Sequence, residues 1–143
     1  MADPRASETA LGHVSEELLG RREELADLLV GEIHRRVPEF AEFGGPELWK
    51  AVRDSCLANL ETGLAALADD RRVPEQVPVD ARELALVTAR LGLPLGGLLR
   101  TYRIGHSLVW TEMFELLEGE ALDAGVRRGA IEVASAYLFE HVD

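Results

Sequence analysis

The sequence contains one cysteine, no secretory signal and few basic residues. The single thiol, Cys56, cannot form a disulfide within the chain, which is typical of a reducing compartment. No apolar segment of a signal peptide follows Met1 to Arg5, and 47% apolar with 29% charged residues indicates neither a membrane span nor disorder. Fifteen Lys and Arg against 26 Asp and Glu give a net charge of −11. We therefore expect a cytoplasmic protein that makes no direct contact with nucleic acid or membrane.

Sequence motifs of catalysis and metal binding are also missing. No histidine has Glu three residues before it, and His-Glu-x-x-His is absent, so neither a di-iron carboxylate site nor a zinc hydrolase site is indicated. Gly92, Gly96 and Gly97 lack the Lys and Ser/Thr that a phosphate-binding loop requires. Ser107 follows His106 directly, but neighbouring helical residues point about 100° apart and do not face each other. We expect no enzyme activity, no cofactor and no metal site.

The apolar residues that are present recur at intervals of three and four, and no alternating strand pattern occurs. A chain of 143 residues is long enough for one core and one domain. The pattern predicts an all-α, single-domain bundle of about five helices. Both a globin-like and a four-helix-bundle-like arrangement agree with it.

Breaking residues set the expected boundaries. Residues 1–10 are expected to be a loose lead-in, 42–46 a turn and 69–78 a loop, and Asp80 is expected to cap the third helix, which ends at Gly92. No Gly, Asn or Pro closes the last helix, so we expect it to continue into a longer protein. The five helices are expected at about 11–34, 46–68, 80–92, 95–118 and 121–143.

The segment from Leu95 to Glu118 is the most informative of the five. Its apolar residues form one broad stripe that we expect to be buried, and Ile104 and Leu108 lie on the opposite side. A helix that is apolar on two sides contacts two neighbours, so Ile104 and Leu108 are candidates for an interface, with a homodimer as the expected assembly. The stripe comprises Leu95, Leu98, Leu99, Tyr102, His106, Val109, Trp110, Met113, Leu116 and Leu117.

Polar groups on this helix are candidates for binding a small molecule of unknown identity. His106 lies within the apolar stripe, where an imidazole can contact a ligand or respond to protons, or can bond to a backbone or Tyr partner with no further role. Arg100 and Arg103 are spaced to hold a carboxylate or phosphate, although pairing with an acid of a neighbouring helix is an equally simple use. Tyr102 and Trp110 complete the candidate set.

Two other classes of protein fit part of the pattern. Residues 84–104 have the outline of a helix-turn-helix, but the following helix is too long and too apolar to lie in a DNA groove. A haem-binding globin is compatible with the length and with four histidines, of which only His106 falls in mid-helix on an apolar face.

The run Leu93-Pro94-Leu95-Gly96-Gly97-Leu98-Leu99-Arg100-Thr101-Tyr102-Arg103-Ile104-Gly105-His106, with Leu108-Val109-Trp110 after it, resembles the N-terminal domain of PucR-type (CdaR-like) actinobacterial transcription regulators. That domain is similar to the RsbT co-antagonist (RsbRD) N-terminal domain, and the likeness extends over most of the chain to Asp143. The resemblance implies a sensory or dimerising helical domain that precedes a GGDEF-like domain and a DNA-binding helix-turn-helix. The alternative is a stand-alone partner-switching module or a sensor of a small ligand or haem.

Overall fold

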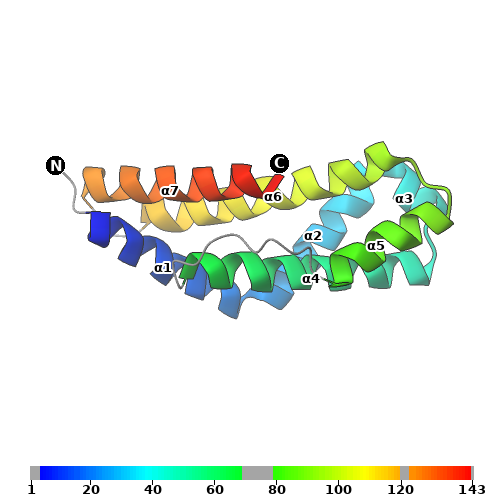
Figure 1. The fold of residues 1–143 in the computed structure, drawn as a ribbon, viewed down its shortest axis with the longest axis horizontal. Helices are drawn as coiled ribbons and strands as arrows, with labels where there is room; N and C mark the ends of the chain where they lie inside the picture. Colours follow the sequence, from blue (N-terminus) through cyan, green and yellow to red (C-terminus); the bar gives the residue numbers. More distant parts are fainter. Residues whose placement is uncertain (1–3, 69–78, 120–122, 143) are drawn as a thin grey trace.

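A computed structural model of the chain describes residues 4–68, 79–119 and 123–142. Within these ranges the fold is entirely helical, with seven helices and no strand, and they pack into one elongated body (Figure 1). None of the described helices is both long and apolar enough to cross a membrane. The helices are α1 (Pro4–Gly20), α2 (Arg22–Arg36), α3 (Pro38–Phe43), α4 (Pro46–Ala68), α5 (Val79–Arg90), α6 (Leu95–Gly119) and α7 (Ala124–Val142).

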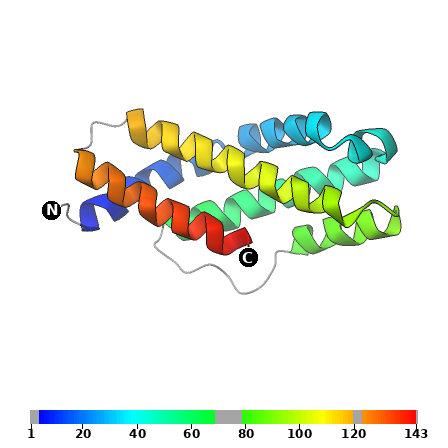
Figure 2. The ribbon, with the colours of Figure 1, turned by 90° about the horizontal axis from the view of Figure 1, so that it is seen from above.

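One continuous core joins these helices. α4 packs against α1, α2 and α5, whereas α7 packs against α1 and α6 (Figure 2). Burial of large apolar side chains is the main stabilising contribution, at roughly 1.5–3 kcal/mol for each side chain. The side chains with no exposed surface include Val14, Leu18, Leu25, Phe40, Leu48, Val52, Met113 and Leu117.

The predicted helices over 46–68 and 95–118 are confirmed. α4 covers the predicted residues 46–68, with Pro46 as its first residue, and α6 runs from Leu95 to Gly119, one residue beyond the predicted end. α7 begins at Ala124 because Asp123 caps it: Asp123 Oδ1 accepts a hydrogen bond of 2.9 Å from the Val126 N–H. The predicted loop at 69–78 lies outside the described residues.

The prediction of one helix over 11–34 was wrong, because the chain changes direction at Arg21. The Arg21 N–H donates to Leu18 O at 2.9 Å, a contact one residue shorter than the helical spacing, and α2 restarts with the Leu25 N–H on Arg21 O. Gly20, which has a low helix propensity, precedes the break. Both α1 and α2 pack against α4 and α6, and α1 also packs against α7.

The expected loose lead-in was also wrong for residues 4–10. α1 begins at Pro4, a residue suited to the first helical position. Ser7 and Ala10 are buried, and Ser7 Oγ donates a 2.9 Å hydrogen bond to Val126 O of α7. Contacts with a helix more than a hundred residues away therefore order this segment, which no local pattern indicates.

A short helix, α3, replaces the beginning of the predicted turn at 42–46. Val37, just before it, and Phe40 are both fully buried, and the Gly44 N–H bonds to Phe40 O at 2.9 Å. The turn is thus shorter than predicted and centres on Gly44 and Gly45. Burial of Phe40 anchors α3 to the core.

α5 begins at Val79, one residue before the predicted cap Asp80, and ends in a Schellman motif. The Leu93 N–H donates to Thr88 O at 3.0 Å and the Gly92 N–H donates to Ala89 O at 3.1 Å. Gly92 has φ of 71°, a left-handed conformation that glycine adopts without steric cost. This motif fixes the sharp turn from α5 into α6.

Replacement of Gly92 by Ala is expected to lower the free energy of unfolding by about 1–2 kcal/mol, because a Cβ disfavours the left-handed conformation. A Cβ there would meet no atom within 4 Å, so the loss comes from the backbone alone. Gly45→Ala is the control, since Gly45 also has an open Cβ position but no positive φ. Urea unfolding that gives the same change for both variants would contradict this explanation.

Candidate functional site

Tyr102, His106 and Trp110 lie on one side of α6 at spacings of four residues, and all three are half-buried. The spacing places them one helical turn apart, so their side chains form a continuous row. The Trp110 ring lies beside the Phe114 ring, with centroids 5.9 Å apart and an angle of 48° between the planes. The structure therefore brings these three predicted residues together at a partly accessible surface.

The imidazole of His106 is held by its own helix. Its Nδ1 lies 2.7 Å from Tyr102 O, and because a carbonyl can only accept, Nδ1 must carry the proton. This bond fixes the orientation of the ring along the row. It also gives His106 the backbone partner that the non-functional alternative predicted.

Cys56 of α4 acts electrostatically on one member of this row, Tyr102, and sequence analysis missed it. Burial raises the pKa of the Cys56 thiol to about 12, against a smaller opposing effect of Arg53. The pKa of the Tyr102 hydroxyl is raised too, first by burial and then by its electrostatic interaction with Cys56. Both groups thus lie in surroundings that disfavour negative charge.

Arg100 points away from the row toward α3. It forms an ion pair with Glu39, a use that the abundance of acids already indicated. Gly97 makes this approach possible, since a Cβ there would lie 2.9 Å from Glu39 Oε1 and 3.3 Å from Phe40 Cε1. Arg100 therefore serves the packing of α3 on α6.

Arg103 is exposed, and no carboxylate among the described residues pairs with it. On a helix Arg100 and Arg103 are about 60° apart around the axis, but the ion pair with Glu39 holds Arg100 on the side of α3. The structure does not bring the two guanidinium groups together as an anion-binding fork. Arg103 instead borders the row near His106.

The two interface candidates are covered within the chain. Ile104 is buried, with 5% of its surface exposed, and Leu108 is half-buried against the core. α6 contacts α1, α2, α5 and α7 along its length, so helices of the same chain account for its second apolar side. Gly105, between the two candidates, lies close to Leu29 of α2.

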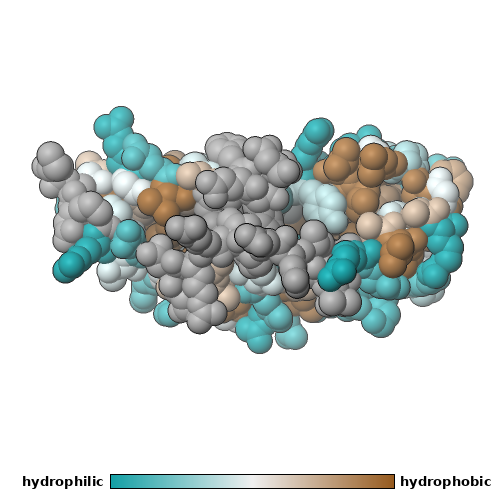
Figure 3. Space-filling view, viewed as in Figure 1, coloured by the Kyte–Doolittle hydropathy of each residue, from teal (hydrophilic) through white to brown (hydrophobic). Residues whose placement is uncertain are grey.

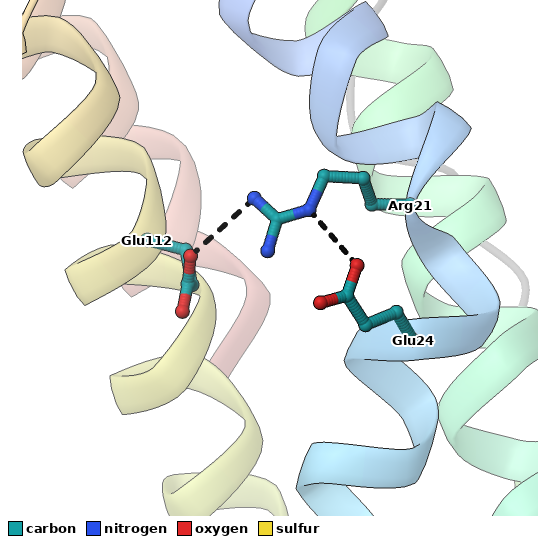
Figure 4. Close-up of polar contacts among 3 residues, drawn as sticks. All are labelled: Arg21, Glu24 and Glu112. Atoms are coloured by element: carbon teal, nitrogen blue, oxygen red, sulfur yellow. Dashed lines mark hydrogen bonds and ion pairs between the residues drawn. The ribbon is translucent and has the colours of Figure 1, made fainter.

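A second feature that sequence analysis missed is the link at the α1–α2 break (Figure 4). Arg21 Nε donates a 3.2 Å hydrogen bond to Glu24 Oε2, and Arg21 Nη1 lies 3.7 Å from Glu112 Oε2 of α6. The hydrogen bond to Glu24 raises the pKa of the Arg21 guanidinium, with further contributions from nearby acids. The bend in the chain is thereby tied to α6 two residues from Trp110. Partly exposed ion pairs are weak, at about 0–1 kcal/mol, so this contact orients the helices more than it stabilises them.

Comparison with known proteins identifies one family. Residues 23–143 match the family described as the RsbT co-antagonist protein rsbRD N-terminal domain. No curated protein and no solved structure matches the chain. The match includes every residue of the row on α6 and leaves out α1.

Proposed function

Because the chain belongs to the RsbT co-antagonist protein rsbRD N-terminal domain family, we propose that it is the signal-sensing or dimerising N-terminal domain of a bacterial transcriptional regulator. In this proposal the domain catalyses no reaction. Its state passes through α7 to a DNA-binding domain outside this chain, and the domain itself makes no contact with DNA. Family membership supports a regulatory role, and the DNA-binding output is our extension of it.

The attachment of α7 carries the proposal. At its beginning α7 is bonded to two helices: Ser7 of α1 donates to Val126 O, and Arg127 Nε donates to Leu117 O of α6 at 3.3 Å. Gly129, one turn on, lies against Ser7 so closely that a Cβ would overlap Ser7 Oγ. A packed helix can change its angle as a unit when such contacts at its beginning change.

The row on α6 is the proposed place for a signal molecule. α7 runs beside α6 and its described end lies next to the middle of α6 (Figures 1 and 2), where Tyr102 and His106 are located. A small molecule on Tyr102, His106 and Trp110 would lie near the described end of α7. It would shift the packing of α7 only to the extent that it binds one arrangement more tightly than the other.

A fusion experiment tests the relay. A DNA-binding domain that represses only as a dimer is attached after Asp143, and repression of a reporter gene is measured in cells. The wild-type fusion is expected to repress. Gly129→Val is expected to change repression by about tenfold, which is within the usual range of coupling between sites.

Gly31→Val is the matched control, because Gly31 lies within α2 and a Cβ there meets no atom within 4 Å. It is expected to leave repression unchanged. A wild-type fusion that represses no better than the isolated DNA-binding domain would reject the dimer. Equal repression by the two Val variants, at equal protein levels, would reject the relay and favour a stand-alone binding module.

A further inference from the structure

One stripe of α6 is buried in one half of the helix and open in the other. Leu95, Leu99, Met113 and Leu117 lie within about 60° of arc around the helix axis, at 100° per residue. Met113 and Leu117 have no exposed surface, whereas Leu95 is 68% exposed and Leu99 44%. The prediction of a stripe buried along its whole length was therefore wrong for the first two turns.

The length and direction of α7 explain this difference. α7 starts beside the end of α6, where Arg127 bonds to Leu117 O, and runs back along it (Figure 2). Its 19 residues span about 28 Å, against about 37 Å for the 25 residues of α6. The described α7 thus covers the second half of the stripe and ends before the first two turns. The open half continues the surface on which a helix already packs.

More apolar side chains surround the open half. Leu91, in the turn between α5 and α6, is 43% exposed, and Leu86 of α5 is exposed as well. Figure 3 shows apolar atoms gathered over the end of the molecule where Figure 1 draws α5 and the start of α6. Clusters of exposed large apolar side chains on a single protein mark sites of interaction. We call Leu91, Leu95 and Leu99 the leucine surface.

The charge around the leucine surface differs from that of the rest of the chain. Residues 84–111 contain no Asp or Glu but three Arg, in a chain that has 26 acids. Two of these arginines, Arg90 and Arg100, are paired with Glu47 and Glu39. Arg103 has no carboxylate partner among the described residues and lies one turn beyond Leu99 on the same side of α6.

We propose that the leucine surface and Arg103 bind an acidic amphipathic α-helix of another protein. The open stripe offers Leu95, Leu99 and then Arg103 at spacings of four residues, which suits leucines and a carboxylate repeated along one side of a helix. A two-fold dimer through this surface is disfavoured, because the same surface of a second copy offers no carboxylate to Arg103. This partner goes beyond the proposed relay, and the two are compatible only if the chain after Asp143 leaves the line of α7 before it reaches the leucine surface.

Peptide binding tests the proposal on the 143-residue protein. The probes are fluorescent helical peptides of about 14 residues, whose three to four helical turns are long enough to cover the open first two turns of α6 and Arg103. They carry leucines at i, i+4 and i+7 with Glu on the flanks, and a second set has Lys in place of Glu. The acidic set is expected to bind at least about tenfold more tightly, and to weaken as salt is added.

Two variants locate the site. Leu99→Asp is expected to weaken binding of the acidic peptides by about tenfold or more, and Arg103→Glu to reverse the preference toward the Lys set. Leu28→Asp is the control for Leu99→Asp, because Leu28 is also 44% exposed but lies on α2. Arg36→Glu, at the end of α2, is the control for the charge reversal.

Three results would overturn the proposal. The first is equal binding of the acidic and Lys peptides, and the second is an equal loss with Leu28→Asp. The third is a protein that self-associates in sedimentation and loses this association with Leu99→Asp while binding no peptide, which would assign the surface to a second copy of the chain. Circular dichroism of each variant verifies that the fold is retained, so failure to bind is attributable to the surface.

Discussion

Ellman's reagent is expected to react with Cys56 about a thousand times more slowly in the native protein than in the urea-unfolded chain, because only the thiolate reacts. Burial raises the thiol pKa from 9.0 to about 12, and three pKa units correspond to a thousandfold lower thiolate fraction. Stopped-flow absorbance at pH 8 measures both rates. Native and unfolded rates within tenfold of each other would show that the thiol is open to solvent and is not shielded by the core.

The same burial predicts how stability changes with pH. Since the pKa of Cys56 is higher in the folded state, its contribution is fully present below pH 9 and is lost as the pH rises toward about 12. The free energy of unfolding is expected to fall by about 1.4 kcal/mol per pH unit in this window. Tyr102, whose pKa is also raised, acts in the same direction above pH 10. Urea unfolding of Cys56→Ala is expected to show a shallower decline, and an unchanged decline would contradict the assignment to Cys56.

Gly129→Val is expected to lower the free energy of unfolding by about 3 kcal/mol, the upper part of the range for overpacked sites. A Cβ at Gly129 would overlap Ser7 Oγ and lie 3.1 Å from Ser7 Cβ, so α7 must move away from α1 and the bond from Ser7 to Val126 O is strained. Gly31→Val, at an open helical position, is expected to change stability by no more than about 0.5 kcal/mol.

A second variant separates this contact from a general effect of valine. In the Ser7→Gly protein the obstructing side chain is gone. Adding Gly129→Val to it is therefore expected to lower the free energy of unfolding by at least about 1 kcal/mol less than Gly129→Val lowers it in the wild-type protein. Urea unfolding of the four proteins gives the interaction energy directly. If the losses in free energy of unfolding caused by the two substitutions simply add, Ser7 and Gly129 do not determine how closely α1 and α7 pack.

Helices whose boundaries depend on local chemistry could be predicted from the sequence. Pro46 sets the start of α4, and Gly119 closes α6. The break at Arg21 and the extension of α1 to Pro4 could not be predicted, because α1 is ordered by contacts with α7, and Gly20 alone does not decide whether a helix bends. Helical periodicity identifies an apolar stripe but not how much of it a neighbour covers, so the exposure of Leu95 and Leu99 was missed.

The candidate site was predictable only where it lies on one helix. The spacing of Tyr102, His106 and Trp110 places them on one side of α6, and the structure bears this out. Contributions from other helices depend on tertiary packing: Cys56 of α4 acts electrostatically on Tyr102, and Arg21, in the break between α1 and α2, forms an ion pair with Glu112. The sequence predicted that Arg100 could pair with an acid of a neighbouring helix, because acids are abundant. It did not predict that the acid is Glu39.

Hydrogen–deuterium exchange of wild type and Gly129→Val tests most directly whether α7 moves as a unit on the rest of the domain. In the variant, amide exchange is expected to be faster in the part of α7 that follows Val126. The exchange rates of α4 and α5 are expected to be unchanged, because the substitution disturbs only the contacts that hold α7 to α1. Exchange that rises equally in all helices, or that stays unchanged in α7, would contradict it.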